Sequence, residues 1–164
     1  RVDRVSIHDL TIDNLDNPFM FILNQRNDCG TIEVERIKAT RIVKSASSVE
    51  SWKGGTFEQI LLRDISIEYV GHDDLSLRDI QAGQPHVDSR ILPCWGLFVR
   101  NVKQLTCENI RLSYTGTEVR PAFLLDNVAA ATFDNVESRQ VQNAKPLVLQ
   151  NSGEVKGIEI KQFK

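Results

Sequence analysis

The sequence predicts an all-β protein, a right-handed, single-stranded parallel β-helix of about six coils with three short strands per coil. Three observations favour this class. A short pattern of apolar residues recurs along the chain, its period is about 25 residues, and no segment shows the periodicity of an amphipathic helix. We expect one such segment over residues 1–164, with a long loop inserted at 71–93.

The recurring unit reads apolar, x, apolar, two polar residues, apolar, x, apolar. Alternation on both sides of the polar step predicts two short strands joined by a bend, and the aliphatic content favours strands. The copies begin at Val5, Ile32, Ile60, Leu105 and Ala131, with a degraded sixth at Val155. A further apolar run follows most copies, at 19–23, 97–99, 123–125 and 147–149, and supplies the third strand.

Stacking these coils predicts ordered columns of residues along the axis. We expect an inward column made by Ile7, Val34, Leu62, Cys107 and Phe133. The bend positions form a polar column, Asp9, Arg36, Asp64, Asn109 and Asn135, and a second polar column holds Asn24, Asn101, Asn127 and Asn151. Asparagine tolerates left-handed backbone and can pair with its copy in the next coil, so we interpret both columns as structural.

One repeat is irregular, because Ile60 and Leu105 are 45 residues apart. The excess lies in 71–93, and a long excursion from a regular scaffold is either functional or disordered. This segment carries His72, His86 and several acids, Asp73, Asp74, Asp79 and Asp88. A shorter excursion at 44–55 carries Trp52 and a Gly-Gly pair.

Composition narrows the function classes. A net charge of −2 without a basic cluster argues against nucleic acid and membrane surfaces, and the chain has no apolar run long enough to span a bilayer. We expect neither a metal site nor a cofactor, since the cysteines lack metal-type spacing. Cys107 is expected in the core, and a bridge between Cys29 and Cys94 is left open. No leader segment is visible, so the chain is either mature or a piece of a longer protein.

The segment LPCWGLFVRNVKQLTCENIRL followed by RPAFLLDNV resembles the C-terminal coils of bacterial proteins similar to glycoside hydrolase family 28. These are the polygalacturonase-like members of the pectate-lyase-type β-helix superfamily. The opening RVDRVSIHDLTIDNLDNPFMFIL is similar to the coil after that family's last catalytic motif. The resemblance spans most of the chain. It implies an extracellular or periplasmic bacterial enzyme that degrades pectin-type, galacturonate-containing glycans.

The family's catalytic motifs are Asn-Thr-Asp, Asp-Asp, Gly-His-Gly and Arg-Ile-Lys, and the first and third are absent here. Arg36-Ile37-Lys38 spells the last, but it lies one coil too late and Arg36 occupies the bend column. Gly71-His72-Asp73-Asp74 matches no motif in order or context, so we interpret it as loop surface. We therefore expect no catalytic residue here, with the catalytic acids upstream of residue 1 and this chain as the inactive C-terminal fragment.

The resemblance implies a substrate groove on the sheet formed by the second strand of each copy. We expect Lys38, Glu68 and Arg111 to face that groove, and His72 and Arg90 to reach it from 71–93, which would wall it. Cations there suit an anionic oligo- or polysaccharide through charge-assisted hydrogen bonds. The alternative is an ordinary solvated strand face. Either tryptophan could stack on a sugar, although Trp95 precedes an apolar run and is expected to pack in the core.

A different functional class stays open, a non-catalytic β-helix that binds carbohydrate or acts as an adhesin-like module. A polysaccharide lyase would need calcium-binding acids, and Asp73-Asp74 alone is too little to argue for one. A solenoid that began at Arg1 would expose an uncapped strand edge. We then expect self-association, or a partner chain, at the N-terminal coil.

Overall fold

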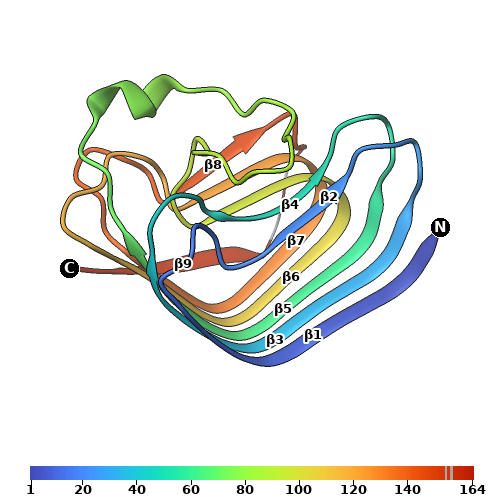
Figure 1. The fold of residues 1–164 in the computed structure, drawn as a ribbon, viewed down its shortest axis with the longest axis horizontal. Helices are drawn as coiled ribbons and strands as arrows, with labels where there is room; N and C mark the ends of the chain where they lie inside the picture. Colours follow the sequence, from blue (N-terminus) through green and yellow to red (C-terminus); the bar gives the residue numbers. More distant parts are fainter. Residues whose placement is uncertain (154, 156) are drawn as a thin grey trace.

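The computed structural model describes residues 1–153, 155 and 157–164, and it forms a parallel β-solenoid of about six turns (Figure 1). Every described strand pairing is parallel, and the described residues contain no α-helix, so the predicted fold class is confirmed. The elements are β1 (Val2–Asp13), β2 (Met20–Leu23), β3 (Cys29–Ile42), β4 (Ser47–Ser51), β5 (Phe57–Val70), the 3₁₀ turn η1 (Leu75–Asp79), β6 (Leu97–Thr115), β7 (Phe123–Arg139), β8 (Leu147–Gln150) and β9 (Ile158–Phe163).

Each coil has three sides, as expected, but the strands are longer than the sequence suggested. In β6, Asn101 and Asn109 adopt left-handed backbone with φ of 59° and 53°, yet the strand continues through both. At each asparagine the strand changes direction, and residues before and after it remain paired with the neighbouring coils. We call the part of each long strand just before the Asn109 column the first face, which in β6 and β7 begins after Asn101 and Asn127, and the part after that column the second face. The third face consists of β2, β4, β8 and the starts of β6 and β7.

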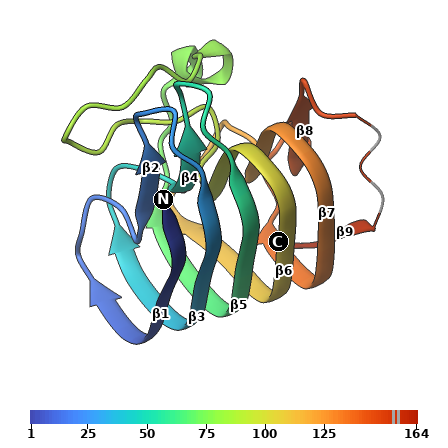
Figure 2. The same cartoon turned by 90° about the vertical axis from the view of Figure 1, so that its right-hand side faces the viewer.

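The predicted inward column is confirmed residue by residue. Ile7 pairs with Val34, Val34 with Leu62, Leu62 with Cys107, and Cys107 with Phe133. Figure 2 shows the strands that carry them, β1, β3, β5, β6 and β7, side by side in that order. The hydrophobic core therefore runs along the solenoid axis.

The bend column is confirmed as a hydrogen-bonded ladder. The amide of Asn135 donates to Asn109 at 2.8 Å, and that of Asn109 donates to Asp64 at 2.9 Å. Arg36 belongs to this ladder, with a φ of 55° and a 2.6 Å hydrogen bond from Nε to Asp9. Its side chain therefore forms a hydrogen bond between neighbouring coils at the corner of the solenoid.

The second polar column needs a correction at its N-terminal end. Asn127 donates to Asn101 at 2.7 Å, but Asn101 donates to the backbone oxygen of Ser51 at 2.6 Å. Ser51 pairs in turn with Leu23, so Asn24 lies one residue beyond the column. The error arose because Leu23 in β2 and Ser51 in β4 occupy this column, so no asparagine marks its position there.

The N-terminal end of the solenoid is open. Among the described strands β1 pairs with β3 alone, and an apolar pocket of about 250 Å³ opens between them and β2. Ile7, Leu10, Phe21 and Ile37 help to line it. Leu10 points toward the core but remains 42% exposed, because none of the described coils covers it on that side.

The insertion at 71–93 folds over the third face (Figure 1). A second, smaller hydrophobic cluster lies outside the solenoid. It contains Leu92 of the insertion, Cys94 directly after the insertion, and Ala46, Phe98 and Leu124. A buried ion pair holds this arrangement, because Arg120 bonds to Glu118 and also donates to the backbone oxygen of Leu92 at 3.0 Å.

Candidate functional site

Three of the five predicted site residues share the second face. Lys38 pairs with Ser66, and Ser66 pairs with Arg111, so Lys38 and Arg111 stand two strands apart in one outward column. Two strand spacings place their backbones roughly 10 Å apart. Glu68 lies two residues further along β5 and points to the same side. The structure therefore brings these three together on one outward-facing surface, where Lys38 and Arg111 are exposed and Glu68 is partly buried.

Arg111 is already engaged on that surface. Its guanidinium bonds to Glu137 of the next coil, and it also lies 4.0 Å from the ring centroid of Phe163. Lys38 is exposed and takes part in no ion pair within the described part of the chain. Lys38 and Arg111 are both exposed, but among the described residues Lys38 is the one of these two without a carboxylate partner.

The two predicted residues from the insertion lie elsewhere. His72 follows β5, and its amide lies 3.4 Å from Glu118, to which it donates. Arg90 lies over the third face, where it donates two hydrogen bonds to Glu50 of β4. The structure does not bring Arg90 next to Lys38 or Arg111, since they occupy different sides of the coil.

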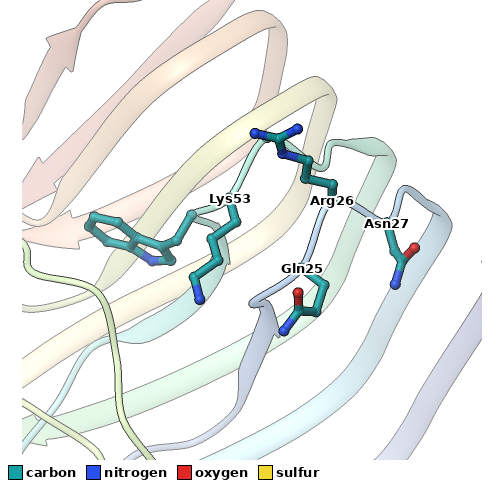
Figure 3. Close-up of a pocket in the computed structure, with 6 residues that line it drawn as sticks. Gln25, Arg26, Asn27 and Lys53 are labelled. Atoms are coloured by element: carbon teal, nitrogen blue, oxygen red, sulfur yellow. The ribbon is translucent and has the colours of Figure 1, made fainter.

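A pocket that sequence reasoning missed lies at the corner between the third and first faces. Its volume is about 850 Å³, and its lining consists of Gln25, Arg26, Asn27, Trp52, Lys53 and Gly54. We call it the corner pocket. The residues come from two neighbouring connections, β2 to β3 and β4 to β5 (Figure 3). In Figure 1 these connections lie at the right, across the coil from the ends of β3 and β5.

Two glycines allow the connections to stack closely. Gly54 has a φ of 85°, which strains any residue with a side chain. A Cβ on Gly55 would collide with the backbone oxygen of Asn27. Asp28 completes the junction by accepting a 2.9 Å hydrogen bond from the amide of Thr56. The Gly-Gly pair was visible in the sequence, but its partner connection was not.

The corner pocket is electropositive. Arg26 and Lys53 supply two cations, Gln25 and Asn27 supply amides, and the described lining contains no acid. Within the described residues neither cation takes part in an ion pair. Figure 3 shows Lys53 and Gln25 extending in the same direction from the two connections. These groups can form hydrogen bonds with a carboxylate and with hydroxyl groups.

The two tryptophans have different environments. Trp95 is 1% exposed and packs edge-on against Tyr69 and Tyr114, which confirms the expected core position. Trp52 is half-buried, lines the corner pocket and donates from Nε1 to Glu50 at 2.8 Å. It therefore connects the pocket with the third face.

Acid catalysis would need a carboxyl group that stays protonated. The carboxyl groups with a clear shift go the other way: Arg36 holds the pKa of Asp9 well below its usual range, and Arg41 lowers that of Asp13. Hydrogen bonding to the adjacent Ser76 lowers the pKa of Asp74 in the insertion. These three carboxyl groups are poor candidates for a general acid.

The thiols are also unsuited to chemistry in the folded state. Cys29, Cys94 and Cys107 are all free and buried, so the possible bridge between Cys29 and Cys94 is absent. Burial raises the pKa of Cys94 to about 12. Among the residues that the structure describes, no group of His, Cys, Asp and Glu side chains could hold a metal ion.

In the described ranges, none of the helical segments has the length and apolar character needed to cross a membrane. Comparisons with protein-family models, with curated proteins and with solved structures each returned no match. The protein is a parallel β-solenoid with an electropositive corner pocket.

Proposed function

We propose that this solenoid binds an anionic oligo- or polysaccharide in the corner pocket. The observation that carries the proposal is the lining, which combines two cations, two amides and a tryptophan in a volume of about 850 Å³. Pockets of roughly 300–1,000 Å³ are typical of small-ligand sites. A chain of uronic acids fits this chemistry because each ring carries one carboxylate and several hydroxyl groups.

Each lining group has a distinct task in this proposal. The Arg26 guanidinium can bind a carboxylate through two parallel hydrogen bonds, whereas Lys53 supplies a mobile point charge. Gln25 and Asn27 can donate to and accept from sugar hydroxyls. Trp52 adds apolar surface for a sugar ring.

We further propose that the chain is the substrate-holding, C-terminal part of a polygalacturonase-like glycoside hydrolase, located outside the cell or in the periplasm. The resemblance of 92–112 and 1–23 to that family supports this proposal. Asp9, Asp13 and Asp74 are poor candidates for the acid, and in this proposal other coils supply the catalytic pair. The same observation also favours a second candidate, a non-catalytic carbohydrate-binding or adhesin-like module.

Calorimetric titration tests the binding proposal. Trigalacturonate should bind, and the neutral galactose trimer should bind much more weakly. Arg26→Met and Lys53→Met should each weaken trigalacturonate binding by about two- to fivefold, since both side chains are exposed and an exposed ion pair is worth up to about 1 kcal/mol. Lys38→Met, which removes a cation from the second face, is the matched control and should leave binding unchanged.

Two results would change the conclusion. Equal binding of both trimers, or no binding at all, would overturn the proposal. Weakening by Lys38→Met but not by Lys53→Met would move the site to the second face, as the sequence predicted. Release of reducing ends from polygalacturonate by this chain alone would contradict its assignment as the non-catalytic part.

A further inference from the structure

A carboxylate lies fully buried beside the corner pocket. Glu50 points outward from β4, yet it is 0% exposed because the insertion covers it. Arg90 of the insertion donates to it twice, from Nη2 at 2.5 Å and from Nη1 at 3.2 Å. Trp52 donates to the same carboxylate from Nε1 at 2.8 Å. One buried acid thus joins the insertion to a residue that lines the pocket.

The buried acid depends on these partners. A carboxylate removed from water is tolerated only when opposite charge and hydrogen bonds replace its hydration. Arg90 provides the charge, and its Nε donates to the backbone oxygen of Gly83 at 3.0 Å, which anchors it within the insertion. The Arg90 side chain is itself largely buried. Glu50 therefore has a defined orientation as long as the insertion holds Arg90.

That orientation is passed to the indole of Trp52. Its N–H is held by Glu50, and the guanidinium of Arg100 lies 4.3 Å from its ring centroid. Arg100 is fixed in turn by Asp126 in the next coil. Trp52 is consequently held at its edge by Glu50 of β4, and a second guanidinium, that of Arg90 in the insertion, lies 5.9 Å from its ring centroid. Arg90, in contrast, is not among the residues that line the pocket.

We propose that the insertion controls ligand affinity at the corner pocket without lining it. Arg90 is a positioning residue, and it acts on the orientation of Trp52 both through Glu50 and across the face of the indole ring. This inference rests on the proposed saccharide binding. Its physical basis is preorganisation, since a side chain already held in its binding orientation loses less conformational freedom when the ligand arrives.

A double-mutant cycle between Arg90 and Trp52 tests this coupling. Arg90→Lys keeps the positive charge beside Glu50 but removes the paired guanidinium geometry. We expect it to weaken trigalacturonate binding by about fivefold, a size typical of coupled neighbouring residues. In the Trp52→Ala background the same change should have no effect. Arg78→Lys, in the exposed turn η1 of the same insertion, is the matched control and should bind like the original chain.

A second measurement reads the position of the indole without ligand. With 5-fluorotryptophan incorporated, fluorine NMR gives one signal for Trp52 and one for Trp95. Arg90→Lys should shift or broaden the Trp52 signal and leave the Trp95 signal in place, because Trp95 packs in the core. An unchanged Trp95 signal also shows that the variant is folded.

The outcomes separate the two levels of the argument. If Trp52→Ala weakens binding but Arg90→Lys does not, the positioning role is wrong and the binding proposal stands. Equal losses from Arg90→Lys in both backgrounds would also overturn the role, because Arg90 would then act independently of Trp52. If the original chain fails to bind trigalacturonate, the proposed function fails, and the inference about affinity fails with it.

Discussion

The N-terminal coil and the covered third face reverse the usual relation between side-chain direction and burial. Leu10 points into the solenoid, yet it is 42% exposed. Ser48 and Glu50 point out of it, yet they are 1% and 0% exposed. Alternation along a strand sets only the direction of a side chain. In this solenoid, burial also depends on whether a coil lies above the residue and whether an insertion lies outside it.

The largest expected effect comes from the ion pair that holds the covered face. Arg120→Met leaves Glu118 buried without its cation, so it should lower the free energy of unfolding by about 3–5 kcal/mol. Arg63, which pairs with Glu33 and Glu108 in a more exposed setting, is the control. Arg63→Met should cost about 1 kcal/mol or less. Urea unfolding followed by circular dichroism measures both, and equal losses would remove the distinction between the two environments.

A second comparison uses one inward column. Leu10, Ile37 and Ile65 are stacked in register, but Ile65 is 3% exposed. Ile65→Ala should cost about 2–5 kcal/mol. Leu10→Ala should cost only about 1 kcal/mol, because much of its surface already contacts water. If both substitutions cost the same in urea unfolding, the N-terminal end is covered in solution.

The open end should also make the isolated chain associate. Among the described strands β1 has one edge without a partner, beside an apolar pocket, and such edges recruit other strands. We expect the apparent mass in light scattering to rise with protein concentration. Val2→Lys should suppress this rise, because it places a charge on the exposed edge. Val70→Lys, at an exposed valine on the second face, should not. A strictly monomeric chain at high concentration would contradict the prediction.

The smallest expected effect is a pH dependence of stability that arises from two carboxyl groups in the N-terminal coil. Hydrogen bonds from Arg36 lower the pKa of Asp9, and those from Arg41 lower the pKa of Asp13, each below the usual value of 3.8. A carboxyl group whose pKa is lower in the folded chain stabilises the fold above its unfolded pKa. That stabilisation is lost as the pH falls toward the folded pKa.

Both carboxyl groups are exposed, so solvent screening keeps the effect small. Asp9→Asn combined with Asp13→Asn should reduce the drop in thermal midpoint between about pH 5 and about pH 2. Both carboxyl groups lie in β1, and their partners Arg36 and Arg41 lie in the neighbouring strand β3. An identical drop in the original and doubly substituted chains would show that neither pair contributes to stability in solution.

The coil geometry could be predicted because it repeats. Ile7 and Phe133 are far apart in sequence, yet both follow the same apolar pattern and occupy one column. The left-handed bend at Asn109 and Asn135 was indicated by residue type alone. Each such position depends on its own coil and its two neighbours, and those neighbours carry the same pattern.

The site could not be predicted in the same way. The corner pocket forms because residues 25–27 and 52–54 lie side by side. Their alignment was hidden in the sequence, because Leu23 and Ser51 occupy the column that continues as Asn101 and Asn127, and Asn24 lies one residue beyond it. Likewise, the spacing of 45 residues located the insertion but not the face it covers. That choice depends on the contacts that Leu92 and Arg90 make, which have no counterpart in the other repeats.

The three buried cysteines can report which region of the solenoid opens locally. Cys29 lies at the start of β3, Cys107 in the middle of β6, and Cys94 beneath the insertion, and all are at most 2% exposed. A maleimide reagent reacts with the thiolate of an accessible cysteine, so each site can be labelled only after its own region opens. The order in which the three thiols acquire label would therefore show whether the molecule comes apart from its N-terminal end, from the covered side, or all at once.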